Sequence, residues 1–293
     1  MPSAEAPIGF INANKPSGIT STAFGSRVRH ALGRVPLGHW GTLDPDASGV
    51  LVLAVGHATR LLPLIGEGRK KYEFDLVLGA ATKTGDASGP VITSGELPRG
   101  WNDMLPDVVA SLVGPLSQVP PMYSAVKVDG QPLYKSARRG EEVARQARMV
   151  EIFSACVLDC GHSRARLSVE CSAGTYVRTL CEEIGLRLGV PAHMDALVRT
   201  AAGPFTIARS CDVEALFADP HSHLIDPLDV LTQPRVVLAA EAALRFRHGN
   251  AVTVADVTSA GDVLVITNGG ISGTGFATAG VAGIVLQPTR VFA

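Results

Sequence analysis

The sequence lacks the features that mark disulfide-rich, membrane-spanning and secreted proteins. Its 293 residues include five cysteines, an odd number with no C-x-x-C pair, which argues against a disulfide framework and a zinc site. No apolar run approaches the length of a membrane span. The first residues, M-P-S-A-E-A-P, have neither the basic start nor the apolar core of a signal peptide. We therefore expect a cytoplasmic protein with no membrane segment.

A strong net charge is also missing, because 26 basic residues face 27 acidic ones and the net charge is −1. The basic residues are nevertheless unevenly placed, since six lie within residues 127–148: Lys127, Lys135, Arg138, Arg139, Arg145 and Arg148. The acids gather later, between Asp212 and Asp229. Such asymmetry is typical of a protein that presents one basic face to a polyanion such as RNA. No P-loop or dinucleotide-binding motif occurs, so we expect no cofactor, and we expect no metal.

The hydrophobic pattern predicts two parts, residues 1–233 and residues 234–293. In the first part, a short apolar run at 50–55 predicts a buried strand, and helical spacing recurs at about 22–32, 106–113 and 177–188. Long hairpin-like strands dominate, so we predict an α+β domain around an antiparallel or mixed sheet. In the second part, short strands between glycine-rich turns predict a small β-barrel module.

Two charged residues stand out because their local surroundings do not favour them. Asp44 lies in a loop of Gly, Pro and small residues that leads directly into the predicted buried strand. A carboxylate there costs free energy unless it is used or paired, although an Asx-turn is the alternative, since Asp before Pro is common in turns. Arg178 falls in the first turn of the helix at 177–188, where the helix dipole favours acids. We therefore predict that Arg178 serves another partner, and that the partner is Asp44.

At this point several segments, in order along the first two hundred residues, resemble the TruB family of bacterial tRNA pseudouridine synthases. They are G-F-I-N-A-N-K-P-S-G-I-T-S from Gly9, G-H-W-G-T-L-D-P from Gly38, K-Y-E-F from Lys71, P-P-M-Y-S-A-V-K-V-D-G-Q-P-L-Y from Pro120, C-S-A-G-T-Y-V-R-T-L from Cys171, and L-V-R-T from Leu197. Ala173 stands where the family commonly has Lys, so that phosphate contact is not carried over.

The resemblance implies isomerisation of uridine 55 in the T-loop of tRNA to pseudouridine, in a pseudouridine synthase catalytic domain with a PUA-like C-terminal module. It implies that Asp44 is the catalytic nucleophile. Arg178 would orient that carboxylate by a planar bidentate contact. Lys15 and Pro16 would brace the catalytic loop. The expected partner is the T-arm of tRNA, with no guide RNA, and we expect a monomer.

The target base lies within folded RNA, so the enzyme must extrude it. By resemblance, Tyr72 stacks on that base, and Tyr176 and Leu197 line the uracil pocket. His39, five residues before Asp44, would fill the gap left by the flipped base. The alternatives are a core strand tyrosine for Tyr72, a turn histidine for His39, and ordinary packing for the other two.

Two other functions remain open. Asp44 and Asp46 form a carboxylate pair, which suggests a retaining glycosidase acting on small sugars, although such enzymes need two carboxyls that flank one bond. The basic stretch and the C-terminal module would also fit an RNA-binding or RNA-folding protein without catalysis.

Overall fold

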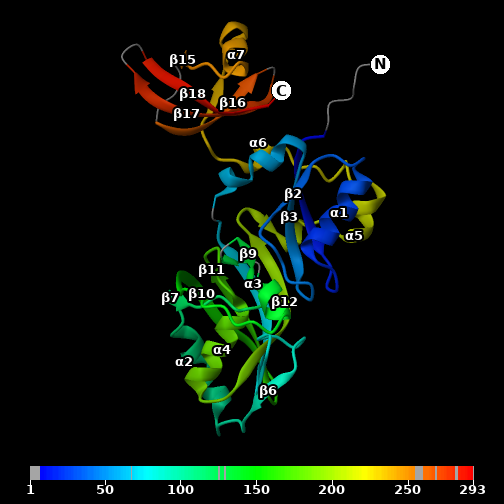
Figure 1. The fold of residues 1–293 in the computed structure, drawn as a ribbon, viewed down its shortest axis with the longest axis vertical. Helices are drawn as coiled ribbons and strands as arrows, with labels where there is room; N and C mark the ends of the chain where they lie inside the picture. Colours follow the sequence, from blue (N-terminus) through cyan, green and yellow to red (C-terminus); the bar gives the residue numbers. More distant parts are fainter. Residues whose placement is uncertain are drawn as a thin grey trace.

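The computed structural model describes residues 7–66, 68–124, 126–128, 130–254, 260–267, 269–280 and 283–292. Figure 1 shows an elongated molecule in which a large sheet with helices forms the body and a smaller sheet lies at one end. The described chain combines helices with a large sheet whose strand pairs are mostly antiparallel, which agrees with the predicted α+β class. None of the described helices combines the length and the apolar character needed to cross a membrane.

Nine strands of the described chain form the large sheet. Seven lie on its main path, in the order β1 (Gly9–Lys15), β3 (Ser48–Val55), β12 (Ala192–Ala202), β4 (Lys70–Leu78), β11 (Arg164–Cys171), β10 (Arg148–Cys160) and β7 (Gly114–Gln118). β2 (Leu37–Trp40) adds to β3, and β13 (Phe205–Thr206) adds to β12. The β12–β3 pair is parallel and the other pairs are antiparallel. The sheet is therefore mixed, as predicted.

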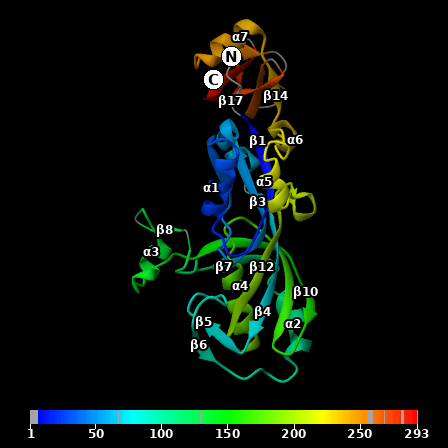
Figure 2. The same cartoon turned by 90° about the vertical axis from the view of Figure 1, so that its right-hand side faces the viewer.

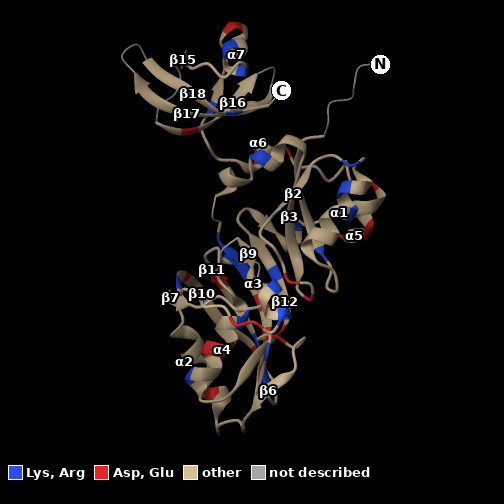
Figure 3. Ribbon diagram, in the orientation of Figure 1, with Lys and Arg blue, Asp and Glu red and all other residues tan. Residues whose placement is uncertain are grey.

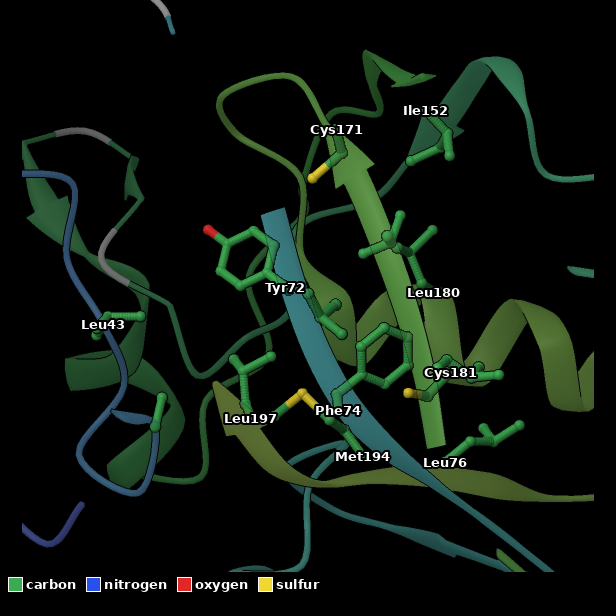
Figure 4. Close-up of a cluster of buried hydrophobic side chains, with 14 of the residues drawn as sticks. Leu43, Tyr72, Phe74, Leu76, Ile152, Cys171, Leu180, Cys181, Met194 and Leu197 are labelled. Carbon is green, nitrogen blue, oxygen red and sulfur yellow. The ribbon is translucent and has the colours of Figure 1, made fainter. Parts of the chain in front are cut away.

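One face of this sheet carries the main hydrophobic core. Its helices are α1 (Ser21–Ala31), α2 (Trp101–Ala110) and α4 (Val177–Leu188), which pack against alternate residues of the strands. Figure 4 shows part of this core, where side chains of β4, β11 and α4 meet. α1 and α4 lie where the spacing predicts them. α2 begins five residues earlier than predicted, because Trp101 continues the buried stripe of Leu105 and Val109 and so places Pro106 inside the helix.

Short elements complete the first part of the chain. They are the 3₁₀ turns η1 (Gly56–Arg60), η2 (Leu62–Ile65) and η3 (Ile207–Arg209), the hairpin of β5 (Ala80–Thr82) and β6 (Val91–Ser94), and the helices α5 (Val213–Ala218) and α6 (Pro227–Val230).

The basic stretch forms a projection beside the body. It contains β8 (Lys127–Val128), β9 (Gln131–Pro132) and α3 (Leu133–Arg138), and Figure 2 shows α3 and β8 standing away from the sheet. Figure 3 shows Lys and Arg gathered near α3 and β9. Arg139 pairs with Glu141 at 2.7 Å, so part of this charge is balanced within the chain. Asp129, which belongs to the stretch, lies outside the described residues.

The C-terminal module contains a five-stranded sheet, in the order β14 (Arg235–Val237), β16 (Gly261–Thr267), β17 (Gly270–Gly280), β18 (Gly283–Val291) and β15 (Val252–Val254). Figure 1 shows this sheet as a curled layer. The expectation of strands alone from residue 236 onward is wrong, because Ala240–Arg247 forms the helix α7. Its residues include strong helix formers and no β-branched side chain, and Ala243 and Phe246 pack on the sheet. Asn268, at the start of the predicted glycine-rich turn, lies outside the described residues.

The two parts share a second hydrophobic cluster on the other face of β3. Val50 and Val52 of β3 contribute to this cluster, whereas Leu51 and Leu53 point into the main core. From the C-terminal module, Leu264, Ile266 and Phe292 enter the same cluster. Both faces of β16 are buried, because the first part of the chain covers one of them. We call this second hydrophobic cluster the shared cluster.

Candidate active site

A large cleft crosses the body of the protein and borders a much smaller cavity. The cleft has a volume of about 1190 Å³ and runs between the loop after β2, the start of α1, the first half of β12 and α3. The cavity has a volume of about 90 Å³. A cavity that holds one water needs roughly 10–15 Å³, so the small cavity has room for only a few waters. Its size therefore suits a single flat ring better than a whole nucleotide. Both are lined by Thr42, Leu43, Asp44, Arg178, Met194 and Leu197.

The structure brings five of the six predicted site residues to the small cavity: Asp44, Tyr72, Tyr176, Arg178 and Leu197. They come from the loop after β2, from β4, from the start of α4 and from β12. His39, the sixth, lines only the larger cleft. Residues separated by as many as 153 positions therefore meet around one space.

Asp44 lies at the boundary between the cleft and the cavity. Its side chain is 41% exposed, but the exposed part faces the concave cleft and is surrounded by protein atoms. Burial raises the pKa of the Asp44 carboxyl above its ordinary value of 3.8, and Arg178 opposes this shift. The loop turn after Asp44 is closed by the main chain, since Ala47 N–H donates to the Asp44 carbonyl at 3.2 Å. The Asp44 carboxylate contacts Arg178 instead of an Asx-turn partner.

Arg178 is the predicted partner of Asp44, and the ion pair joins its Nη2 to Asp44 Oδ2 at 2.9 Å. The guanidinium is 5% exposed, and Nη2 also donates to the Tyr123 carbonyl at 2.8 Å. The bidentate contact expected from the sequence is wrong, because Nη1 turns away and donates to the Thr84 carbonyl at 3.1 Å. Arg178 thus ties the Asp44 carboxylate to two other segments of the main chain.

Asp86 is a second carboxylate beside Arg178 that the sequence analysis missed. Its Oδ2 lies 3.7 Å from Arg178 Nη1, and its Oδ1 accepts hydrogen bonds from Thr84 and Ser88. Asp86 also raises the pKa of Asp44. Asp86 sits in a turn-like G-D-A-S-G segment, and nothing local distinguishes it from a solvated turn aspartate.

Tyr72 projects from β4 toward the cavity and is buried. Figure 4 shows its ring between Leu43 and Cys171, with Leu197 nearby. Burial raises the pKa of the Tyr72 hydroxyl above 10.0, and the adjacent Arg199 guanidinium opposes the shift. Tyr72 is therefore a neutral phenol near neutral pH, which can relay a proton but does not hold a negative charge.

Two buried basic side chains, Lys15 and Arg199, donate hydrogen bonds to the main chain of the loop that contains Asp44. Lys15 Nζ donates to the carbonyls of Pro16, Ile19 and Pro45, which confirms that Lys15 braces the loop, and burial lowers its pKa to about 8. Arg199, which the sequence analysis did not single out, donates from Nε to the Val50 carbonyl at 2.7 Å. Its Nη2 donates to the Gly41 carbonyl at 3.0 Å. An arginine in the middle of an apolar strand was the signal that could have identified it.

Leu197 reaches the cavity through an irregularity in β12. The register between β12 and β4 shifts between Asp195 and Val198, and the intervening Ala196 has a φ of 47°. Asp195 Oδ1 accepts a hydrogen bond from Ala196 N–H at 2.8 Å. Bulges of this kind redirect side chains beside functional sites, and here the bulge directs Leu197 toward the cavity wall.

His39 and Tyr176 complete the predicted set. His39 lies on β2, half-buried, with Nε2 3.3 Å from Thr42 Oγ1. Burial, followed by the Arg199 guanidinium, lowers the pKa of His39 below 6.5, so its ring is neutral near pH 7. Tyr176 precedes α4, and the Gln118 side chain holds its main chain by accepting from N–H at 3.0 Å and donating to the carbonyl at 3.4 Å.

The described residues contain no group of three or more His, Cys, Asp or Glu side chains that is placed to hold a metal ion. The polar groups that converge on the cavity are a carboxylate, a guanidinium and a phenol. This set can supply a nucleophile, a fixed counter-charge and a proton relay around a base-sized space.

Comparison with known proteins identifies the family. The model of the TruB family pseudouridylate synthase N-terminal domain matches residues 29–177, and that of the tRNA pseudouridylate synthase B C-terminal domain matches residues 178–234. The chain is 44% identical over 266 residues to tRNA pseudouridine synthase B of Pseudomonas putida strain GB-1, covering 88% of this chain and 87% of that protein. It is 43% identical over 254 residues to the protein of the same name from Geobacter sulfurreducens, covering 82% and 81%.

Solved structures agree on the fold. A chain of an H/ACA RNP bound to a substrate RNA containing 2′-deoxyuridine is similar, with a TM-score of 0.70 at 24% identity, covering 97% of this chain and 85% of that chain. A chain of a Cbf5-Nop10-Gar1 complex gives a TM-score of 0.66 at 26% identity, with the same coverage. The matched domains and the close relatives together show that this chain belongs to the TruB family of pseudouridylate synthases.

Proposed function

We propose that this chain isomerises uridine 55 in the T-loop of tRNA to pseudouridine, with Asp44 as the nucleophile. The observation that carries the proposal is the position of Asp44, which a buried arginine holds where an RNA-sized cleft meets a base-sized cavity. Membership of the family and the relatives named tRNA pseudouridine synthase B support the reaction and the tRNA substrate.

The reaction needs a group that can attack, form a covalent intermediate and leave. The Asp44 carboxylate bonds to the nucleoside, the bond between uracil N1 and ribose C1′ breaks, and the uracil turns. A carbon–carbon bond then forms between C5 and C1′, Asp44 is released, and the proton from C5 is lost while N1 gains one. Arg178 holds the carboxylate in place and favours its charged form before attack and after release.

The site separates the roles of the surrounding residues. The flipped base enters the small cavity, where Tyr72 stacks on it and relays the proton, and Tyr176 and Leu197 form the walls. His39 stays in the outer cleft, where its neutral ring fills the space that the base leaves in the RNA. α3 adds Arg138 and Tyr134 to the far wall of the cleft, suited to the phosphates and bases of the T-arm.

Other parts of the proposal concern partners. We propose that the C-terminal module is PUA-like and adds RNA contacts, and that the enzyme works as a monomer without guide RNA. Since its substrate is tRNA, we place the enzyme in the cytoplasm. Unmodified tRNA is incubated with the protein, with and without an added guide RNA, and pseudouridine is then mapped. Pseudouridine at position 55 tests the choice of uridine, and its formation without the guide RNA tests independence from a guide.

The assignment of Asp44 is tested with two carboxylate variants of the same loop. Asp44→Asn should abolish turnover under single-turnover conditions by several orders of magnitude while tRNA binding stays within a few-fold, because many contacts supply affinity. Asp46→Asn, two residues away and exposed, should keep most of the rate. Equal loss in both variants would contradict a role that belongs to Asp44 alone, and pseudouridine formation by Asp44→Asn would refute the nucleophile. Binding of tRNA without turnover by the natural sequence would favour the non-catalytic alternative.

A further inference from the structure

The residue before the proposed nucleophile is held by an unusual partner. Leu43 N–H donates to Ser21 Oγ at 2.9 Å, and Ser21 Oγ donates to the Leu43 carbonyl at 2.9 Å. Both residues are buried. A single hydroxyl thus satisfies both main-chain groups of Leu43, as a neighbouring strand would in a sheet.

Ser21 is itself firmly placed. It is the first residue of α1, whose N-terminus is capped by Thr20 Oγ1, which accepts from Ala23 N–H at 3.0 Å. Phe24 and Val28 of the same helix pack in the main core. The hydroxyl therefore reaches the catalytic loop from a rigid element, not from another loop.

The other side of Asp44 is anchored from the same segment. The Pro45 carbonyl accepts from Gly18 N–H at 2.9 Å and from Lys15 Nζ at 3.3 Å. Asp44 thus lies between two anchored residues, and its carboxylate is directed to Arg178. Leu43 also lines the small cavity, so its position sets both the shape of the cavity wall and the position of the Asp44 main chain that follows it.

We propose that Ser21 is a positioning residue for the reaction, which sets the place of Asp44 through the main chain of Leu43. The inference rests on the proposed function of Asp44. Ser21 does not touch the reacting atoms in this role. Without its hydroxyl the buried N–H and carbonyl of Leu43 lose that partner, and the loop must shift to find water or another donor.

Ser21→Ala tests the role with a minimal change of volume. We expect the single-turnover rate of pseudouridine formation to fall roughly 10- to 100-fold, because a shift of about 1 Å in a reacting group costs about that much. The dissociation constant for tRNA should stay within about twofold, since phosphate contacts dominate affinity. Ser21→Cys keeps a weak donor and acceptor at the same place, so its rate should lie between those of serine and alanine.

A matched control separates positioning from general stability. Ser272 is a buried serine of the C-terminal module whose hydroxyl pairs with Thr267, far from the loop in the chain. Ser272→Ala should keep the rate of the natural sequence at a temperature where circular dichroism shows every variant folded. If Ser21→Ala does not fold, Ser21→Cys must still show the lowered rate.

The outcomes are distinct. A slow Ser21→Ala, an intermediate Ser21→Cys and a normal Ser272→Ala support the inference. A normal rate for Ser21→Ala overturns it, as does an equal loss in Ser272→Ala, which would make the effect one of stability. Absence of pseudouridine with the natural sequence would instead overturn the proposed function itself.

Discussion

Ending the chain at Pro234 is expected to destabilise the remaining part of the protein as well as to remove the RNA contacts proposed for the C-terminal module. From sequence alone such a chain should keep turnover, because every motif precedes residue 200. The structure indicates otherwise, since the shared cluster would lose three buried side chains: Leu264, Ile266 and Phe292. A polar link across the same junction would also be lost, because Arg60 Nη1 donates a hydrogen bond to the Val291 carbonyl at 3.1 Å.

The magnitude follows from these side chains. Full burial of a Leu, Ile or Phe side chain stabilises a protein by roughly 1.5–3 kcal/mol, so three of them give about 4.5–9 kcal/mol as an upper estimate. The whole stability of a typical protein is about 5–15 kcal/mol. The stack of the His57 and Phe292 rings, with centroids 5.5 Å apart, would also be lost. Truncation should therefore remove most of the free energy of unfolding.

Thermal unfolding followed by circular dichroism measures this effect. In the full chain, Phe292→Ala should lower stability by roughly 3–5 kcal/mol, as loss of a buried ring does elsewhere. Val237→Ala, in the same module but 77% exposed, should change it by no more than about 0.5 kcal/mol. A chain ending at Pro234 that unfolds cooperatively near the transition temperature of the full chain would refute the energetic role of the shared cluster.

Three further predictions concern the site. Arg178→Lys should lose roughly 100-fold or more in single-turnover rate, because an ammonium cannot reach the separate acceptors that the planar guanidinium joins; a near-normal rate would contradict the orienting role. Tyr72→Phe should bind tRNA normally but lose roughly 10²–10⁴ in rate if the hydroxyl moves the proton; equal rates would leave stacking as its role. Because the pKa of Asp44 is raised, protonation on lowering the pH should remove the nucleophile with a midpoint above 3.8, measured as the acid limb of the rate profile; a midpoint below 3.8 would contradict the burial of Asp44.

Local patterns carried much of the fold and part of the site. The short apolar run at 50–55 predicted the buried strand β3, and helical spacing predicted α4. The mismatch between Arg178 and the dipole of its helix pointed to Asp44, and the ion pair confirms that pairing. These inferences succeeded because each rests on neighbouring residues in the chain. One rests on the spacing of apolar residues, and the other on the unfavourable energy of a cation in the first turn of a helix.

Other features depended on contacts that no local pattern reports. Arg178 bonds to Thr84 across 94 positions, and Arg199 bonds to Val50 across 149. Whether Asp86 is a solvated turn residue or the second carboxylate beside Arg178 depends on how the β5–β6 hairpin folds against α4. Likewise α7 escaped prediction because its eight residues are a short segment among strand-like ones, even though they favour a helix.

The sequence by itself determined the family, the α+β class and the identity of the nucleophile candidate, since these depend on motifs and periodicity along the chain. Only the tertiary structure decided that a single nitrogen of Arg178 contacts Asp44, and that Ser21 bonds to the main chain of Leu43. It also decided that the C-terminal module shares a hydrophobic cluster with the first part of the chain. The physical reason is that buried polar groups must find partners wherever packing brings them. Those partners come from segments whose separation in the chain carries no information about their distance in space.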